Sequence, residues 1–443
     1  MKFTPARLAE LDGKYRHIKT PALDRPEAQR DPKVIETVSQ MLSTIEADGI
    51  DAVRRYARDL DGFESADFEL TASDLAKSGD LLSEELRAAL ELGSERTKSF
   101  ARETRSHLVD FEMELAPGLV TGQRYVPIER VGAYVPAGRF PLLAGAFMTV
   151  GVAKVAGVDT VIACTPPRRD GSADPAVLYA AHLSGADRVF VLGGVQALAA
   201  MAFGLLGDHP VDMLVGAGNA YVAEAKRQLF GTVAIDLLAG PSEVAVIADE
   251  TADPATVAAD LLGQAEHGIE SPAALVTTSE ALAREVVAAA ETQLQELKTS
   301  DIAGPAWRDY GSVTWAQDRE TAIALMDDLA PEHLEIQTAD DDYYHENLRN
   351  YGSIFLGPWS TVAYSDKGMA GTNHVLPTAG GARHSAGLSV SRYLKPLTYQ
   401  RVSRDATPAA AEAVETISQY EGMAAHEATA TIRLEAYHGR EDV

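Results

Sequence analysis

The chain has 443 residues, 46% of them hydrophobic and 23% charged, and this length accommodates roughly two to four globular domains. Its 65 acidic residues against 39 basic ones give a net charge of -26, which argues against nucleic acid and anionic membranes as partners. The single cysteine, Cys164, excludes an intrachain disulfide and a cysteine-based zinc site. Without a signal peptide or a membrane-spanning run, the sequence predicts a cytoplasmic protein.

The first part of the chain has a helical pattern. Charged and apolar residues alternate at helical spacing up to residue 110 or so, as in the stretch 81–90. We therefore expect residues 1–118 to form a helical N-terminal segment.

The sequence pattern changes near residue 119, where short apolar runs begin to alternate with helical stretches. The runs occupy residues 132–136, 160–163, 189–192 and 212–215. Strands separated by helices predict a parallel sheet, and hence a first α/β domain over residues 119–235. Cys164 lies at the end of the second run and is interpreted as a core residue rather than a nucleophile.

A second series of runs predicts a second α/β domain over residues 236–380. These runs occupy residues 243–248, 273–277, 311–315 and 352–356. A cleft between two such Rossmann-like domains is a natural place for a ligand. After Pro396 the helical pattern returns, so residues 381–443 are expected to form a helical C-terminal segment.

Two glycine-bearing loops follow predicted strands of the first α/β domain. One runs from Gly216 through Gly218 to Asn219, and Tyr221 stands where a dinucleotide fingerprint has its third glycine. The other begins at Gly193 and Gly194. Both loops are consistent with a pyrophosphate close to the backbone, and equally with tight turns.

Gln264 and His267 are three positions apart in a stretch, 254–267, that has helical composition and no internal proline. Residues at this spacing share one face of a helix, so an amide oxygen and an imidazole are both available to a divalent metal. The alternative is a chance pair on a solvated helix.

Further polar residues follow in the second half of the chain. Glu332 and His333 stand side by side at a predicted strand start, and they are the residue types most used for proton transfer near neutral pH. The loop 366–378 carries oxygen and nitrogen ligands, and His426 lies in the terminal helical region. Solvated turns and structural roles are the competing interpretations.

Together these phrases resemble the histidinol dehydrogenase family over nearly the whole chain. The resemblance is carried, in this order, by residues 235–244, 264–267, 331–334, 371–378 and 421–426. That family consists of NAD-dependent, zinc-containing homodimers that oxidise a primary alcohol through an aldehyde to a carboxylate, using two NAD per turnover. The resemblance therefore implies an intertwined dimer in which the C-terminal segment is exchanged.

The resemblance also implies roles for individual residues. The zinc ligands would be Gln264, His267, Asp366 and His426, the last supplied across the dimer. Glu332 and His333 would be the acid/base pair. The residues contacting NAD would be Tyr134, Gln196 and Asn219, and those contacting substrate would include Ser242, His374 and Glu421.

Two departures from the family pattern bear on the substrate. Arg139 stands in a loop where histidinol-specific members have a small residue, and Lys367 follows Asp366 where they have tyrosine. Two cations suit an anionic substrate, so we favour the branch that resembles sulfopropanediol 3-dehydrogenase, which oxidises 2,3-dihydroxypropane-1-sulfonate to sulfolactate. Both cations are otherwise surface charges that offset an acidic protein.

Other interpretations stay open at this stage. One is a biosynthetic L-histidinol dehydrogenase, and another is a metal- or nucleotide-binding homologue that has lost catalysis. The spacing from Asp366 to His374 is one residue longer than the family pattern, so either the loop bulges or Asp366 is not a ligand.

Overall fold

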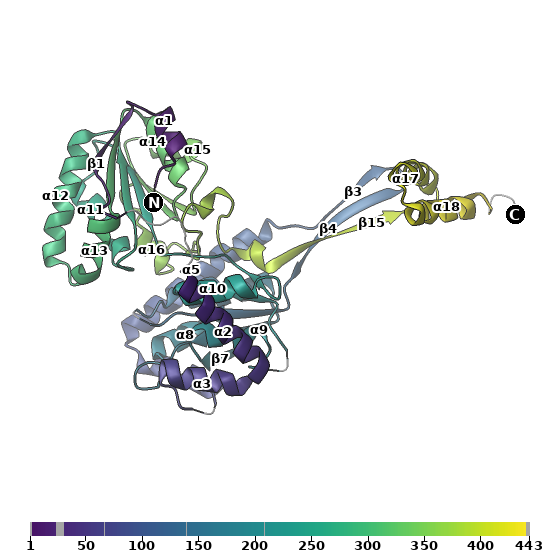
Figure 1. The fold of residues 1–443 in the computed structure, drawn as a ribbon, viewed down its shortest axis with the longest axis horizontal. Coiled ribbons are helices and arrows are strands. Elements are labelled where there is room, and N and C mark those ends of the chain that lie inside the picture. The colour runs from purple at the N-terminus through teal and green to yellow at the C-terminus, as the bar shows by residue number, and fades with distance from the viewer. Residues whose placement is uncertain (1, 24–30, 66, 139, 208, 440–443) are drawn as a thin grey trace. The chain divides into compact units, whose positions relative to one another are not determined.

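The computed structural model describes residues 2–23, 31–65, 67–138, 140–207 and 209–439. Contacts divide the chain into two compact units. The larger comprises residues 1–103 and 128–393, and the smaller comprises residues 104–127 and 394–443. Figure 1 labels their helices and strands. The chain is a mixed α/β protein in which both six-stranded sheets are mainly parallel, as the sequence predicts.

The first sheet of the larger unit has the strand order β2-β7-β6-β5-β8-β9. Its strands are β2 (Glu69–Leu70), β5 (Arg130–Tyr134), β6 (Thr160–Thr165), β7 (Arg188–Val191), β8 (Met213–Val215) and β9 (Ala234–Ile235). Helices α2 (Pro32–Asp48), α3 (Ile50–Asp61), α9 (Gly194–Ala202) and α10 (Ala220–Leu229) share a core with this sheet. Cys164 is fully buried in that core, and burial raises the pKa of its thiol, which confirms a packing role.

The second sheet has the strand order β1-β12-β11-β10-β13-β14. Its strands are β1 (Tyr15–Lys19), β10 (Val244–Ala248), β11 (Ala273–Thr277), β12 (Ser312–Ala316), β13 (His333–Gln337) and β14 (Ser353–Leu356). Along β10, Val244 and Val246 pack into one core while Ala245 and Ile247 pack into another, because successive side chains point to opposite faces. Helices therefore cover both faces of this sheet.

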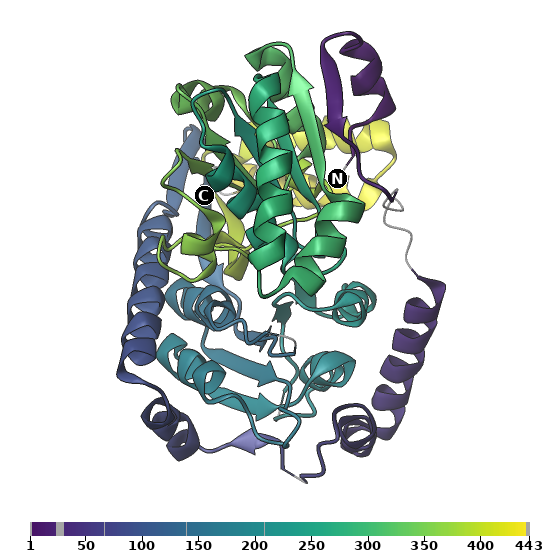
Figure 2. The same ribbon diagram turned by 90° about the vertical axis from the view of Figure 1, so that its left-hand side faces the viewer.

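The helices on the two faces differ. Helices α11 (Pro254–Ala265), α12 (Glu280–Glu296) and α13 (Ser300–Tyr310) contribute to the first core, and α1 (Pro5–Glu10), α14 (Arg319–Leu329) and α15 (Asp341–Asn347) contribute to the second. In Figure 2 helices coloured green lie in front of the sheet. The remaining α-helices before residue 394 are α4 (Ala72–Ser78), α5 (Glu84–Ser106), α6 (Ala144–Ala146), α7 (Val152–Ala156), α8 (Pro175–Ser184) and α16 (Val362–Asp366).

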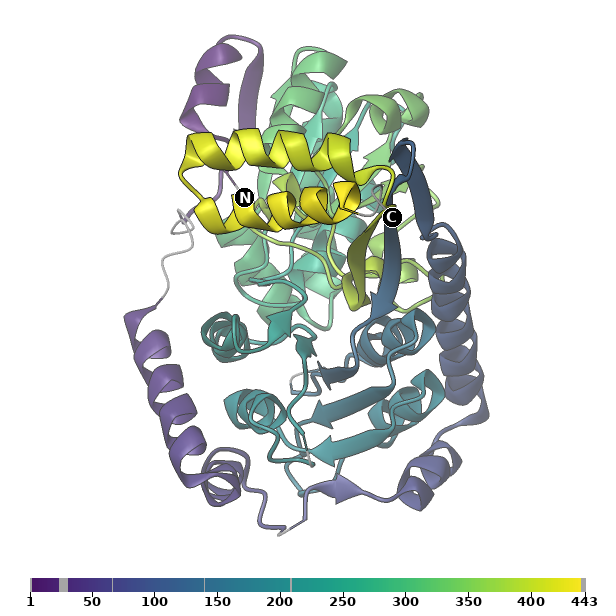
Figure 3. The same cartoon turned by 90° about the vertical axis from the view of Figure 1, so that its right-hand side faces the viewer.

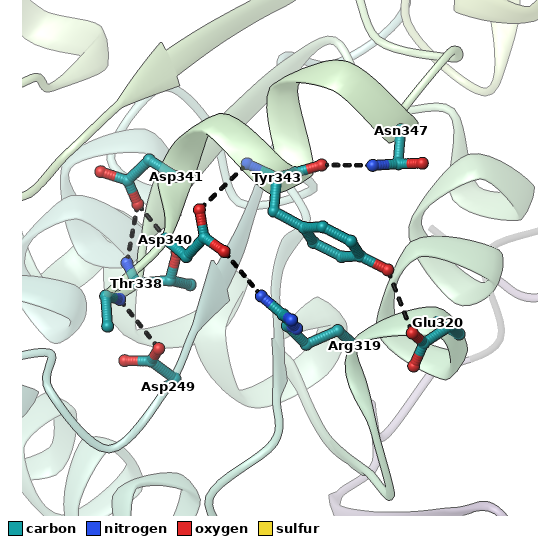
Figure 4. A network of polar contacts seen from close by, with 9 residues as sticks. Asp249, Arg319, Glu320, Thr338, Asp340, Asp341, Tyr343 and Asn347 are labelled. Atoms are coloured by element: carbon teal, nitrogen blue, oxygen red, sulfur yellow. Dashed lines mark hydrogen bonds and ion pairs between the residues drawn. The ribbon is translucent and has the colours of Figure 1, made fainter.

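Polar side chains form a network of hydrogen bonds and ion pairs at the carboxyl ends of strands in the second sheet (Figure 4). Asp249, directly after β10, accepts a hydrogen bond from the backbone N–H of Ala339 beyond β13. Arg319 opens α14, pairs with Asp340 at 2.8 Å and lies over the ring of Tyr343 on α15. The Arg319–Asp340 ion pair connects α14 to the residue that precedes α15, and the Asp249 hydrogen bond connects the ends of β10 and β13.

The prediction of a purely helical N-terminal segment, residues 1–118, is wrong at three short strands. β1 and β2 each add an antiparallel edge strand to one of the two sheets, and β3 (Phe111–Ala116) is the third. Edge strands this short carry exposed charged residues, as in Arg16 of β1, and have no long apolar alternation. Their strand state is set by the sheet they pair with.

The smaller unit is a twisted hairpin sheet followed by two helices. β3, β4 (Leu119–Pro127) and β15 (Leu394–Val402) form an antiparallel sheet of order β15-β4-β3. β15 corrects the prediction that residues 381–443 are wholly helical. Helices α17 (Thr407–Glu421) and α18 (Ala424–His438) follow, lie side by side in Figure 3 and are tied by Gln419 Nε2, which donates to Glu427.

Apolar side chains on this smaller unit are unusually exposed. Tyr420 is 95% exposed, and only Ala411, Ser418 and Ala430 of the two helices are buried. Exposed apolar side chains on an antiparallel helix pair are typical of an interaction surface. None of the described helices combines the length and apolarity that crossing a bilayer requires.

Candidate active site

The candidate site is built at the amino ends of β10 and β13, which are neighbours in the second sheet. Ser242 and Glu243 precede β10, and Glu332 precedes β13. The Ser242 hydroxyl donates to Oε2 of Glu332 at 2.7 Å, and the backbone N–H of Glu243 donates to the same oxygen at 2.9 Å. Gln264, at the end of α11, donates from its amide nitrogen to the Ser242 hydroxyl. The Glu332 carboxylate is thus buried and held by two donors.

His333, the first residue of β13, connects this carboxylate to a second histidine. Its Nδ1 lies 3.0 Å from the carbonyl oxygen of Glu243 and 3.4 Å from Oε2 of Glu332. Its Nε2 lies 3.2 Å from Nδ1 of His374. The sequence predicts Glu332 and His333 as a pair at a strand start, and the structure confirms that placement. The contact with His374 joins residues 41 positions apart.

A loop after α16 brings His374 to this position. The neighbouring Asn373 donates from its amide to the carbonyl oxygen of Met148 at 2.8 Å, and the His374 N–H donates to the Met148 sulfur. Met148 lies in a π-helical turn, Phe147–Gly151, between α6 and α7. The carbonyl oxygen and the sulfur of Met148 in this turn therefore anchor the loop that carries His374.

The pKa values of the two histidines are shifted in opposite directions. Burial lowers the pKa of His333, but the charge of Glu332 and its hydrogen bonds outweigh burial and raise it above the ordinary value. Burial and the nearby charge of His333 lower the pKa of His374 to about 3. His333 is therefore the proton acceptor of the pair, and His374 stays neutral. Nε2 of His374 is buried and has no hydrogen-bond partner among the described residues.

Three of the four predicted zinc ligands lie in the larger unit. α11 ends at Ala265, so His267 lies in the following turn, where its N–H donates to the Gln264 carbonyl, and the prediction of a helix through His267 is wrong by two residues. Asp366 is the last residue of α16, and its carboxylate pairs with Nζ of Lys367 at 2.5 Å.

His267 and Asp366 each influence the pKa of the other. Burial lowers the pKa of His267, with the Asp366 charge opposing it. Burial raises the pKa of Asp366, but Lys367 and His267 outweigh burial and lower it below the ordinary value. A neutral imidazole and an ionised carboxylate are the forms that bind zinc.

The donor set fits zinc. Gln264 Oε1, the His267 imidazole and the Asp366 carboxylate supply the oxygen and nitrogen donors that zinc accepts. No three His, Cys, Asp or Glu side chains of the described chain by themselves form a metal-ligand cluster. His426 and Glu421 lie in the smaller unit, on α18 and at the end of α17, and both are exposed there.

The predicted NAD-contacting residues follow the carboxyl ends of strands in the first sheet. Tyr134 ends β5, and its hydroxyl accepts from the Gly194 N–H at 3.3 Å. Asn219 caps α10 by accepting from two backbone N–H groups. Ends of parallel strands that open into helices are where doubly wound sheets bind nucleotides.

Gln196 occupies a position that the sequence alone does not explain. It is buried in α9, and its amide donates to Oδ2 of Asp61 at 2.8 Å. Asp61 is the last residue of α3, and burial raises the pKa of its carboxyl while the Gln196 hydrogen bond opposes that shift. Asp61 lies 135 positions from Gln196, so no local pattern points to it.

Gly216, which follows β8, provides a test of this loop. Its φ is 114°, and an added Cβ would lie 2.1 Å from the carbonyl oxygen of Tyr134. We expect Gly216→Ala to destabilise the fold by about 1–3 kcal/mol and to weaken NAD binding. Thermal unfolding and cofactor titration measure the two effects. Gly304→Ala is the matched control, because its added Cβ meets nothing within 4 Å. Equal stability of the two variants would contradict this reading of the loop.

The predicted substrate-contacting residues are only partly gathered. Ser242 and His374 belong to the hydrogen-bonded chain around Glu332 and His333, and Lys367 lies next to Asp366 with its side chain 64% exposed. Arg139 lies outside the described residues. Glu421 lies in the smaller unit.

Known relatives cover almost all of this chain. The sequence model of a family described as histidinol dehydrogenase matches residues 23–434. A histidinol dehydrogenase homolog of Ruegeria pomeroyi is 47% identical over 402 residues, covering 90% of this chain and 92% of its own. Sulfopropanediol 3-dehydrogenase of the same organism is 44% identical over 406 residues, covering 91% and 93%. Histidinol dehydrogenase of Methanosarcina mazei is 42% identical over 391 residues, covering 88% and 90%.

The fold has an equally extensive counterpart. The crystal structure of histidinol dehydrogenase from Elizabethkingia anophelis matches with a TM-score of 0.88 and 33% sequence identity, covering 94% of this chain and 95% of that one. A family match over most of the sequence, joined to a match over most of the fold, establishes kinship for the whole chain. The protein belongs to the histidinol dehydrogenase family, whose chemistry is the NAD- and zinc-dependent four-electron oxidation of an alcohol to an acid.

Proposed function

We propose that this protein oxidises a primary alcohol through an aldehyde to a carboxylate at the site formed by Glu332, His333 and their neighbours. The observation that carries the proposal is the continuous, largely buried chain of polar contacts from Gln264 through Ser242 and Glu332 to His333 and His374. These contacts connect Gln264, a candidate metal ligand, to His333, a base whose pKa is raised. Detection of NADH and of the carboxylic acid as products, with alcohol as substrate, tests it.

We assign zinc binding to Gln264, His267 and Asp366, with His426 as a fourth ligand from a second subunit. NAD would contact Tyr134, Gln196 and Asn219. When bound, the zinc ion would polarise the substrate oxygen and NAD would accept the hydride. The exposed apolar side chains of α17 and α18, such as Tyr420, support an intertwined homodimer, because a partner surface would bury them.

In the first oxidation His333 accepts the hydroxyl proton of the substrate. Its raised pKa makes it a stronger base than a free imidazole, and the adjacent Glu332 carboxylate stabilises the imidazolium that forms. The Glu243 carbonyl accepts the hydrogen on Nδ1, which leaves Nε2 as the basic nitrogen.

In the second oxidation the aldehyde must first take up water. Glu332 is placed to accept a proton from that water, because its Oε2 is already oriented by Ser242 and Glu243. Once His333 is protonated, its Nε2–H donates to Nδ1 of His374, so the unpartnered Nε2 of the neutral His374 carries a hydrogen that can be donated to a substrate oxygen. One site therefore provides a base and a donor for both steps.

For the substrate we favour an anionic diol such as 2,3-dihydroxypropane-1-sulfonate, which would give sulfolactate. Lys367 supplies an exposed ammonium beside Asp366, where a sulfonate would find a charge-assisted contact. The 44% identical relative named sulfopropanediol 3-dehydrogenase supports this choice. L-Histidinol is the second candidate, supported by the 42% identical relative named histidinol dehydrogenase.

A panel of alcohols followed by NADH absorbance distinguishes these candidates. Turnover of the sulfonate diol with little turnover of L-histidinol is the expected result. The reverse preference would contradict the anionic assignment and leave the four-electron chemistry intact. Failure of every alcohol on the zinc-loaded protein, with zinc and NAD still bound, would favour a homologue that binds both and catalyses nothing.

Lys367→Gln tests the charge directly. We expect the KM for the sulfonate substrate to rise about tenfold with kcat retained, because one charge-assisted contact is worth about 1.5 kcal/mol. Initial rates at varied substrate concentration measure the change, and Lys33→Gln, which removes an exposed lysine on α2, is the control. An unchanged KM in the Lys367 variant would exclude this lysine from substrate binding.

A further inference from the structure

Asp260 and Glu335 form a carboxyl pair beside the candidate active site. Glu335 is 1% exposed and lies on β13 two residues after His333, on the same face of the sheet. Asp260 lies on α11, one helical turn before Gln264. No step of the proposed reaction uses either carboxyl.

The pair is held by three donor residues from two segments, β13 and the start of α16. Gln337 of β13 donates from Nε2 to Oδ2 of Asp260 at 2.7 Å and to Oε2 of Glu335 at 3.3 Å. The Thr361 hydroxyl donates to Oδ1 of Asp260 at 3.0 Å. The Val362 N–H, at the first residue of α16, donates to Oε1 of Glu335 at 2.9 Å.

Two buried carboxyls that are hydrogen-bonded to each other share one proton. Burial raises the pKa of Glu335 well above its ordinary range, and the neighbouring charge of Asp260 raises it further. Burial also raises the pKa of Asp260, while the hydrogen bond with Glu335 opposes that shift. Glu335 is therefore the carboxyl of the pair with the higher proton affinity, and it is the donor in the hydrogen bond between them.

Each of the three joined segments carries a residue of the candidate site. β13 begins with His333, the proposed base. α11 presents Gln264 one turn after Asp260, and α16 ends at Asp366 one turn after Val362. The hydrogen bonds of the pair therefore cross between the elements whose relative positions determine whether these ligands converge.

α16 depends most on this arrangement. It has five residues, too few for a helix to be stable alone, and the Thr361 side chain makes no capping hydrogen bond to it. The N–H of its first residue is satisfied by Glu335 instead. Orienting Gln337 toward both carboxyls leaves its Oε1 buried and unpartnered among the described residues, so the arrangement is retained at a cost in hydrogen bonding.

We infer that Asp260 and Glu335 are positioning residues that hold α11, α16 and β13 in the register that lets Gln264, His267 and Asp366 converge on one metal ion. The inference rests on the proposed zinc site. Neither carboxyl touches substrate or metal in this role. Residues that orient metal ligands through hydrogen bonds typically change metal affinity by about 10–100-fold when they are removed, and this pair orients the segments that carry the ligands.

The test measures zinc affinity of the full-length protein by competition with a chromogenic chelator. Asp260→Ala and Glu335→Ala should each weaken zinc binding by about 10–100-fold. Glu335→Gln should keep the wild-type affinity, because its amide carries a hydrogen where the carboxyl is protonated and still offers an oxygen to Val362. Thr361→Val, which is nearly isosteric and removes one hydrogen bond, should give a smaller loss and covers the case in which an alanine variant does not fold.

The control is Asp174→Ala, which removes a buried carboxylate that caps α8 and pairs with Arg168 in the first α/β half. It should lower thermal stability without changing zinc affinity or the absorption spectrum of the cobalt-substituted protein. Wild-type affinity and cobalt spectrum in folded Asp260→Ala and Thr361→Val would overturn the inference. A wild-type protein that binds no zinc would instead overturn the proposed function, so the two failures are distinguishable.

Discussion

Replacing His333 by asparagine should lower kcat by about 10²- to 10⁴-fold, the usual contribution of a positioned general base. His333 is 3% exposed, lies against the Glu332 carboxylate and the Glu243 carbonyl, and is the member of the histidine pair with the raised pKa. Asparagine retains a donor toward Glu243 but cannot accept a proton near neutral pH. Steady-state rates with NADH detection measure the loss.

Zinc content and thermal stability distinguish a lost base from a damaged site. Both should stay close to wild type in the His333 variant, because the proposed metal ligands Gln264, His267 and Asp366 are untouched. His17→Asn is the matched control, since it alters an exposed imidazole on β1 that bonds Thr314 and should leave kcat unchanged. Wild-type kcat in the His333 variant would remove His333 from the mechanism.

Replacing Glu332 by glutamine should block the second oxidation and shift the pH dependence of the first. The amide is neutral, so it cannot accept a proton from the water that hydrates the aldehyde, and acid formation should fall by about 10²- to 10⁴-fold. Aldehyde should then be recoverable with a carbonyl-trapping reagent. Product analysis of the reaction mixture measures the ratio of aldehyde to acid.

The pH shift has a definite sign. His333 must be neutral to accept a proton, so kcat falls as the pH drops below its pKa. The Glu332 charge raises that pKa, and its loss should move the acid limb of the profile to lower pH. A low-pH limb that stays in place would show that the Glu332 carboxylate does not influence the pKa of His333. Carboxylic acid formed at the wild-type rate would show that Glu332 does not activate the water.

Most of the parallel framework follows from sequence because its strands are buried on both faces. The run at 244–248, Val-Ala-Val-Ile-Ala, is apolar throughout and flanked by helical stretches, which is the signature of a central parallel strand. Glu332 and His333 could be placed at a strand start for the same reason. β1 and β15 could not, because their alternation is interrupted by exposed charged residues such as Arg16 and Lys395.

The sequence does not predict the contacts of the site that join residues far apart in the chain. His333 and His374 meet because the amino end of β13 faces a loop anchored on Met148, and neither neighbourhood contains a signal for the other. Asp61 reaches Gln196 in the same way. The chemical type of these residues is readable locally, whereas their pairing depends on how the strands and helices are packed.

The most direct test of the account is the position of the metal. Crystals of the zinc-loaded protein, measured at the zinc absorption edge, should show one anomalous peak per active site within bonding distance of Gln264 Oε1, the His267 imidazole and the Asp366 carboxylate. A zinc peak elsewhere, or none after zinc has been supplied, would contradict the proposed site.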